Sequence, residues 1–165
     1  MEFGANKQNR SVKIQPLLRK GSDETYNLKI NEIDSEKFFV HSVSLGFPKY
    51  RITNTRTKFA QLVYIKNNDL HTDFFSDPER LDVQEAQHSI LQVVYRKKGL
   101  YDEFKGGVKQ IDPLIMTIDG FIISGNRRLA VLRDLVEIDS QDYDYFKTIK
   151  IVVYPYEVDS DQVRK

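Results

Sequence analysis

Cysteine is absent from the 165 residues of this chain, and tryptophan is absent as well. Without a thiol, the protein cannot form a disulfide, a zinc–thiolate site or a cysteine nucleophile. The lack of cysteine also fits a reducing compartment, so we expect a cytoplasmic location. The sequence contains no run of 18 apolar residues and no basic-then-apolar leader, which predicts a protein without membrane segments.

An excess of one charge sign is also lacking, because 25 basic side chains accompany 24 acidic ones and the formal net charge is +1. This balance argues against a highly basic nucleic-acid coat protein and against an acidic tail. Hydrophobic residues make up 40% of the chain, which is enough for the core of one compact domain. Residues 1–22 are rich in lysine and arginine and predict a basic, flexible arm, which leaves 23–165 as a single domain.

The first half of the chain has few strong patterns. Short alternating runs at residues 26–30 and 38–43 predict strands of a half-buried sheet. The polar stretch 54–57 predicts a loop, and residues 66–77 predict an irregular connection.

The clearest predicted helix follows Asp77, which can cap it, or begins as late as Asp82. Its apolar side chains recur at intervals of three and four residues up to Val94, which places them on one face. Lys97 and Lys98 suit its carboxyl end, Gly99 can supply a left-handed stop, and residues 105–107 predict a flexible loop.

The second half predicts a compact unit. Strands are predicted at residues 114–118 and 121–123, joined by the hairpin signal Asp119-Gly120. Leucines at helical spacing from Leu129 predict a second helix, and residues 148–154 predict another strand. We therefore expect an α/β (α+β) domain with a small mixed sheet and packed helices.

The segment with the clearest chemistry is the break between strand and helix at Ser124, Gly125 and Asn126, followed by Arg127 and Arg128. The first amides of a helix lack partners and the helix dipole is positive there, so two arginines at that end oppose the dipole. A bound phosphate would make the arrangement favourable, because free amides and guanidinium groups both bind oxyanions.

Two alternatives remain open for these arginines. They can be solvated, or they can pair with the protein's own carboxylates, for which Asp119 and Asp134 are the candidates. Gly125 would then serve only as a turn.

The run DGFIISGNRRLAVL at residues 119–132 resembles the signature of the ParB and sulfiredoxin superfamily, in which a hairpin ends at a Gly-x-x-Arg turn followed by a helix. Residues 89–90, Gly99 and 112–114 occur in the order of this family. The stretch 54–56 resembles the Asn-containing segment ending in Arg that precedes the family's helix. The resemblance implies an α/β fold whose turn holds nucleotide phosphates with Mg²⁺.

The sequence departs from the family at two places. Asn126 stands where sulfiredoxin needs a cysteine and where segregation ParB proteins carry an acidic residue, so we expect at most slow hydrolysis. The family's acidic-Asn pair, expected after Val158, is absent before Lys165. We therefore interpret the chain as the amino-terminal part of a longer protein.

The resemblance adds Asn54, Arg56 and Thr57 as a second wall of the phosphate pocket, whose alternative is an ordinary polar loop. Glu85 is a weaker candidate for a Mg²⁺ ligand, since most such helix glutamates are simply solvated.

Our leading hypothesis is a ParB-like domain that binds a nucleoside triphosphate (CTP or ATP) with Mg²⁺ through residues 124–128. It would close or form a homodimer, as a switch in DNA partitioning, regulation or defence. One alternative is a ParB-like nuclease that cleaves DNA. Another is a non-catalytic DNA-binding or assembly module, which would contact DNA through the basic arm or the missing carboxy-terminal region.

Overall fold

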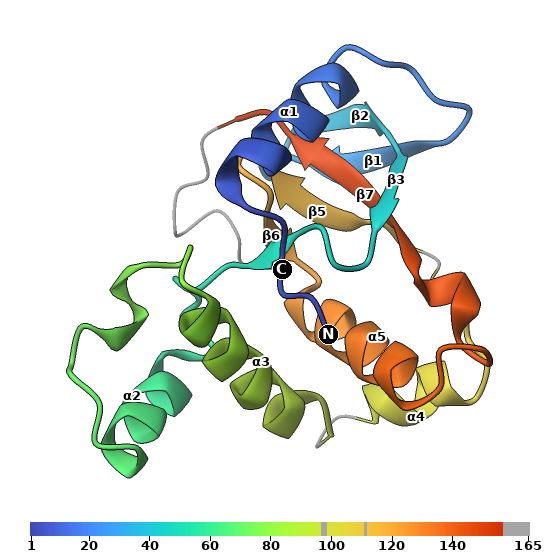
Figure 1. Cartoon of the computed structure of the whole chain (residues 1–165). Helices are drawn as coiled ribbons and strands as arrows, with labels where there is room; N and C mark the ends of the chain where they lie inside the picture. Colours follow the sequence, from blue (N-terminus) through green and yellow to red (C-terminus); the bar gives the residue numbers. More distant parts are fainter. Residues whose placement is uncertain (97–98, 111, 157–165) are drawn as a thin grey trace.

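The computed structural model describes residues 1–96, 99–110 and 112–156. It is a mixed α+β structure with a five-stranded and a two-stranded sheet, so the predicted fold class is confirmed. In Figure 1, α2, α3, α4 and α5 gather in the lower half, whereas α1 and the two-stranded sheet lie at the top. No helix of the described residues is long and apolar enough to cross a membrane.

The helices are α1 (Lys7–Leu17), α2 (Lys58–Asn67), α3 (Leu81–Arg96), α4 (Leu100–Lys105) and α5 (Asn126–Ile138), with short 3-10 helices η1 (Phe74–Ser76) and η2 (Asp144–Phe146). The strands are β1 (Thr25–Lys29), β2 (Ser35–Phe39), β3 (His41–Ser44), β4 (Lys49–Tyr50), β5 (Leu114–Thr117), β6 (Phe121–Ser124) and β7 (Thr148–Tyr154). β1 and β2 form the small antiparallel sheet, and the large sheet has the order β3-β7-β5-β6-β4.

The large sheet separates two hydrophobic cores, and β7 shows why. Successive side chains of a strand point to opposite faces, so Ile149, Ile151 and Val153 join the larger core with α1, α3, α4 and α5. Val152 and Tyr154 point the other way and pack with side chains of β1 and β2. The two-stranded sheet therefore covers the face of the large sheet that the helices leave open.

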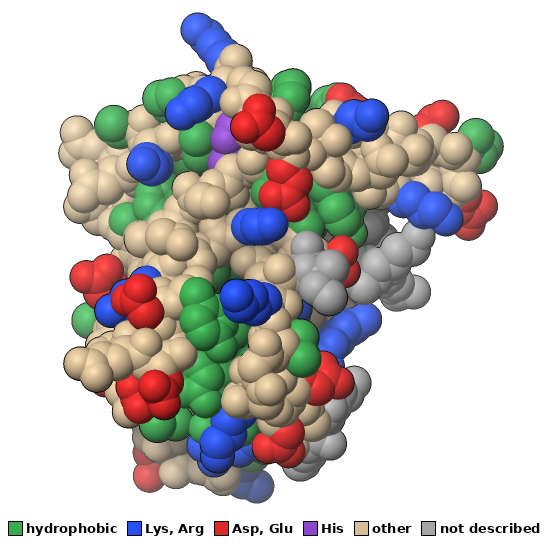
Figure 2. Space-filling view, turned by 90° about the vertical axis from the view of Figure 1, so that its right-hand side faces the viewer, with side chains coloured by type: hydrophobic (Ala, Val, Ile, Leu, Met, Phe, Trp, Pro, Cys, Tyr) green, Lys and Arg blue, Asp and Glu red, His purple; other side chains and the backbone are tan. Residues whose placement is uncertain are grey.

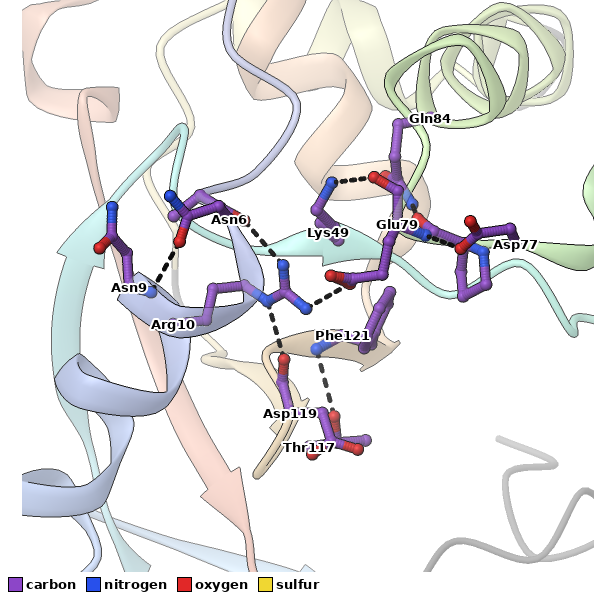
Figure 3. A network of polar contacts seen from close by, with 12 residues as sticks. Asn6, Asn9, Arg10, Lys49, Asp77, Glu79, Gln84, Thr117, Asp119 and Phe121 are labelled. Carbon is purple, nitrogen blue, oxygen red and sulfur yellow. Dashed lines mark hydrogen bonds and ion pairs between the residues drawn. The ribbon is translucent and has the colours of Figure 1, made fainter.

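The prediction of a flexible basic arm at residues 1–22 is wrong. Asn6 caps α1 by accepting a hydrogen bond from the N–H of Asn9 over 2.8 Å, and Ile14 is fully buried in the core. Arg10 is 1% exposed and donates from Nη2 to Glu79 over 2.5 Å and from Nε to the carbonyl of Asp119 over 2.8 Å (Figure 3). Because one buried guanidinium joins three distant segments, α1 is part of the domain.

The other differences concern helix ends and short helices. α3 begins at Leu81, near the later of the two predicted starts, and Asp77 instead accepts from the N–H of Glu79 in a preceding turn over 3.0 Å. The predicted strand at 38–43 is divided between β2 and β3, and neither α2 nor α4 was predicted. Gly99 has the expected left-handed conformation, at φ +71°, whereas Lys97 and Lys98 lie outside the described residues.

Candidate functional site

The turn from β6 into α5 has a shape that glycine adopts most easily. Gly125 lies there at φ +106°, and a Cβ atom on it would fall 2.4 Å from Cδ2 of Leu114. Residues with a side chain rarely adopt this left-handed conformation, so backbone and packing both require glycine here. The sequence thus places a tight bend at Gly125, two residues before Arg127.

The first turn of α5 presents main-chain donors. The first hydrogen bond of the helix joins the N–H of Leu129 to the carbonyl of Gly125 over 2.9 Å. The N–H groups of residues 126–128 precede that bond, and such groups have no partner within a helix. No side chain caps this end, and no acidic residue lies in its first turn. Free donors and the positive end of the helix dipole therefore favour an anion at this turn.

This turn borders a cavity of about 1080 Å³. The lining comes from the loop after β4, the second half of α3, the start of α4 and the β6–α5 turn. All eight residues of the two predicted phosphate-binding walls border it: Asn54, Arg56, Thr57, Ser124, Gly125, Asn126, Arg127 and Arg128. The structure therefore brings together two segments that lie some 70 residues apart in the sequence.

The sheet explains why these two segments meet. β4 and β6 are parallel neighbours, with Lys49 opposite Phe121 and Tyr50 opposite Ile122. The carboxyl ends of parallel strands meet at the same edge of a sheet, so the loop after β4 and the turn after β6 open into one space. Pairing of only two residues on each strand thus positions both walls.

Four arginines line the cavity: Arg51, Arg56, Arg127 and Arg128. No ion pair joins any of them to a carboxylate within residues 1–96, 99–110 and 112–156. The hydrogen bonds of Arg128 and Arg51 go to uncharged groups, from Nη1 of Arg128 to the carbonyl of Asp112 over 2.9 Å and from Nε of Arg51 to Thr53 over 3.2 Å. The cavity wall thus carries an excess of positive charge.

The two carboxylates that could have neutralised these arginines have other roles. Asp134 accepts hydrogen bonds from His88, Gln92 and Tyr95. Asp119 offers its main-chain carbonyl to Arg10 rather than its carboxylate to the turn. Neither of the proposed internal ion pairs forms.

Burial lowers the pKa of two of the four guanidinium groups. Desolvation lowers the pKa of Arg51. It also lowers the pKa of Arg128, and the neighbouring charge of Arg127 adds to the effect while Asp112 and Tyr26 oppose it. Both groups remain charged at neutral pH, because an arginine titrates far above it. A bound anion would offset the cost of holding these charges partly away from water.

Two of the predicted ligand-binding side chains support the walls instead. Asn126 is 6% exposed, and its side-chain amide donates to the carbonyl of Ile122 over 2.9 Å and accepts from the N–H of Arg51 over 3.3 Å. Thr57 is 2% exposed, and its hydroxyl donates to the carbonyl of Asn54 and accepts from Gln87 over 3.1 Å. Asn126 can still offer its main-chain N–H to a ligand.

Three buried glutamines, which no pattern in the sequence singles out, hold β4 and the loop that follows it. Gln84 accepts from the N–H of Tyr50 over 2.8 Å and donates to its carbonyl over 3.0 Å, as a neighbouring strand would. Gln61 donates to the carbonyl of Ile52 and to Gln87, both over 2.9 Å. Because buried amides are costly when unpaired, this network fixes the second wall to α2 and α3.

The structure does not bring the predicted metal ligand to the cavity. Glu85 is exposed on α3 and does not border the cavity. The acidic residue that lines the cavity is Glu103 instead. Among the described residues, no group of three or more His, Asp or Glu side chains is arranged to hold a metal ion.

Comparisons with known proteins add no identification. No protein-family model, curated protein or solved structure matches this chain.

Proposed function

We propose that this chain binds a nucleoside triphosphate, CTP or ATP, in the arginine-lined cavity. The observation that carries the proposal is the set of four arginines that line one cavity without an ion pair in the described part of the chain. Arginine is suited to phosphate because its planar group donates paired, charge-assisted hydrogen bonds. The phosphates would lie at the start of α5, where main-chain N–H groups add further donors.

The size and composition of the cavity suit a nucleotide. At about 1080 Å³ it is slightly above the usual range for small-ligand pockets, roughly 300 to 1,000 Å³. Its wall also includes the apolar side chains of Leu91, Val94, Leu100 and Ile123. A ligand with a charged end and a flat, less polar end matches such a wall better than inorganic phosphate does.

The resemblance of residues 119–132 to the ParB and sulfiredoxin signature supports the same ligand class. Asn126 cannot act as a carboxylate base, and its amide is already bonded to main-chain groups. We therefore propose a switch with at most slow hydrolysis, which acts in a DNA-associated process in the cytoplasm. Binding would close the domain or pair it with a second copy.

Magnesium would enter with the nucleotide. Mg²⁺ keeps several of its waters and commonly binds through substrate phosphates and one or two carboxylates. The described residues offer no preformed carboxylate cage. The protein's own contribution is then the arginines and amides that hold the phosphates.

Isothermal titration calorimetry of the whole chain with CTP, ATP and GTP, with and without Mg²⁺, tests the proposal. We expect binding at millimolar nucleotide or below, and a loss of at least tenfold in affinity in Arg127→Ala/Arg128→Ala, since each charge-assisted bond contributes about 1.5 kcal/mol or more. Arg19→Ala/Lys20→Ala is the matched control, because it removes an adjacent exposed cationic pair that does not border the cavity.

Failure of the folded protein to bind any of the three nucleotides would refute the proposal, as would equal affinities of the two double variants.

The two alternatives are weaker on physical grounds. Metal-dependent nucleases hold their ions with clustered carboxylates, and the described residues contain no such cluster. A DNA-binding surface is usually broadly basic, whereas Figure 2 shows lysine and arginine mixed with aspartate and glutamate on the visible part of one face. Cleavage of DNA that Arg128→Ala abolishes, or DNA binding indifferent to nucleotide, would favour one of these alternatives.

A further inference from the structure

The guanidinium of Arg128 is held beside the β6–α5 turn by two contacts. Its Nη1 donates to the carbonyl of Asp112 over 2.9 Å. Its Nη2 lies against Gly125, since a Cβ atom on that glycine would fall 3.0 Å from Nη2. An arginine carries five N–H donors, and the bond to Asp112 uses one of them. The guanidinium therefore lies next to the main-chain N–H groups that begin α5, with donors left for an anion.

The carbonyl that holds Arg128 has a second partner. It accepts a hydrogen bond from Nε2 of Gln110 over 3.0 Å. A carbonyl oxygen has two lone pairs, so the two donors can share it. Asp112 itself is exposed, and Pro113 after it restricts its backbone to extended conformations. The direction of this carbonyl thus depends on the proline and on Gln110.

Gln110 is fixed in turn by strand β7. Its Oε1 accepts from the N–H of Lys150 over 2.9 Å, and its Nε2 donates to the carbonyl of the same residue over 2.9 Å. β5 begins its pairing with β7 at Leu114 opposite Ile151, so this side chain bonds the main-chain groups of β7 just before that pair. Both hydrogens and the oxygen of the amide are used, and such a fully bonded amide holds a defined position.

We infer that Gln110 is a positioning residue for anion binding: it fixes the carbonyl of Asp112 relative to β7, and that carbonyl holds the guanidinium of Arg128 in place for a phosphate. This inference rests on the proposed nucleotide binding. A mobile arginine loses rotamer freedom when a ligand immobilises it, which weakens binding. Arg128 loses this freedom when the protein folds, so the ligand meets a group that is already in place.

Isothermal titration calorimetry of the whole chain with CTP, ATP and inorganic triphosphate, each with Mg²⁺, tests the inference. Gln110→Met keeps an uncharged side chain of similar length but removes the hydrogen bonds of the amide. We expect it to weaken binding about fivefold, which is the cost of immobilising one long side chain.

Two backgrounds show whether Gln110 acts through Arg128. In Arg128→Ala, the change Gln110→Met should alter affinity by less than about 1.5-fold, because the guanidinium that it positions is gone. In Arg127→Ala, the same change should keep its effect of about fivefold. Gln141→Met is the control, since Gln141 is exposed and does not border the cavity, and it should leave affinity unchanged.

Nitrogen-15 relaxation of arginine side chains supplies a measurement that needs no ligand. In the free protein, the order parameter of the Nε–H bond of Arg128 should be that of a rigid group, about 0.8. In Gln110→Met it should fall below about 0.6, because the carbonyl of Asp112 is no longer held. This measurement also decides the question if Arg128→Ala binds too weakly for calorimetry.

The outcomes separate this inference from the function on which it rests. Nucleotide binding that Gln110→Met leaves unchanged, or weakens equally with and without Arg128, would overturn the role of Gln110 and leave the proposed function standing. An unchanged order parameter would do the same. Binding of inorganic triphosphate but of neither nucleotide would refute the proposed function, while the two backgrounds would still test Gln110. Binding of none of the three anions by the folded protein would overturn both.

Discussion

Helix α5 carries two pairs of neighbouring charged residues, and the two pairs differ in their surroundings. Arg127 and Arg128, in its first turn, border a cavity and form no ion pair within the described residues. Arg133 and Asp134, further along the same helix, are 2% and 8% exposed. The comparison separates charges that serve the fold from charges that border a cavity without an ion pair among the described residues.

The second pair is held by partners from several elements. Nε2 of His88 lies 2.8 Å from Asp134, and Gln92 and Tyr95 donate to the same carboxylate. Arg133 donates to the main-chain carbonyls of Leu45 and Pro48, the latter over 2.7 Å. Its guanidinium also lies over the ring of Tyr50, 4.8 Å from the ring centre.

The difference teaches that side-chain type does not decide the role of a charge. A buried charge with several hydrogen-bond partners contributes to conformational specificity and is costly to disrupt. A charge with few partners at a helix start does little for stability and remains available to a ligand. Substitutions at Arg133 and Asp134 should therefore change stability, whereas substitutions at Arg127 and Arg128 should change ligand binding.

The largest expected effect is on the second pair. Asp134→Asn should lower the free energy of unfolding by about 3 kcal/mol, because it leaves partners of a buried carboxylate poorly satisfied. Urea denaturation measures this effect. Glu137→Gln is the control on the same helix, since that carboxylate is 60% exposed and should change stability by about 0.5 kcal/mol or less. Equal losses would contradict the distinction between the two regions.

The acid dependence of the same variant sharpens the test. Burial acts to raise the pKa of Asp134, but the hydrogen bonds from His88, Tyr95 and Gln92 outweigh it and hold the pKa below its ordinary value. A lowered folded-state pKa contributes stability that is present above the unfolded pKa, near 4, and is lost as the pH falls through the folded pKa. The stability difference between wild type and Asp134→Asn should therefore shrink below about pH 4, and a constant difference from pH 7 to pH 3 would contradict this.

The next effect compares two glycines that both have positive φ. Gly125→Ala should cost about 3 kcal/mol, because it combines left-handed backbone strain with a contact of 2.4 Å to Leu114. Gly99→Ala should cost about 1 kcal/mol, since Gly99 has no neighbour within 4 Å of the added Cβ. Thermal unfolding compares them, and similar costs would show that packing at the β6–α5 turn is looser than the structure indicates.

Local patterns in the sequence were sufficient for much of the second half of the fold. The strands predicted around the hairpin signal Asp119-Gly120 and at residues 148–154 match β5, β6 and β7 to within one residue. The β6–α5 turn was also predictable, because glycine and the following helix pattern are local signals. Whether residues 124–128 and 54–57 bind a phosphate remains a prediction.

The parts of the fold and of the cavity wall that were not predicted depend on contacts between residues far apart in the sequence. α1 was predicted as a flexible arm because its charges resemble those of a solvated segment. Folding, however, brings Arg10 to its hydrogen-bond partners Ala5, Glu79 and Asp119, two of which are distant in the sequence. Arg51 and Glu103 line the cavity, but no local pattern in the sequence marks either as a site residue. Burial of glutamines is equally invisible in sequence, because their partners are main-chain groups of another segment.

The smallest expected effect concerns the first turn of α5. Arg127→Ala removes a positive charge from the positive end of a helix dipole, so it should leave stability unchanged or raise it by about 0.5 kcal/mol at low salt. Arg133→Ala, six residues further along, should cost about 3 kcal/mol, because it empties a buried, hydrogen-bonded site. Urea denaturation at low and high salt compares the two variants. A loss above about 1 kcal/mol in Arg127→Ala would show that this side chain has a structural partner, and the case for a ligand at the turn would then rest on Arg51, Arg56 and Arg128 alone.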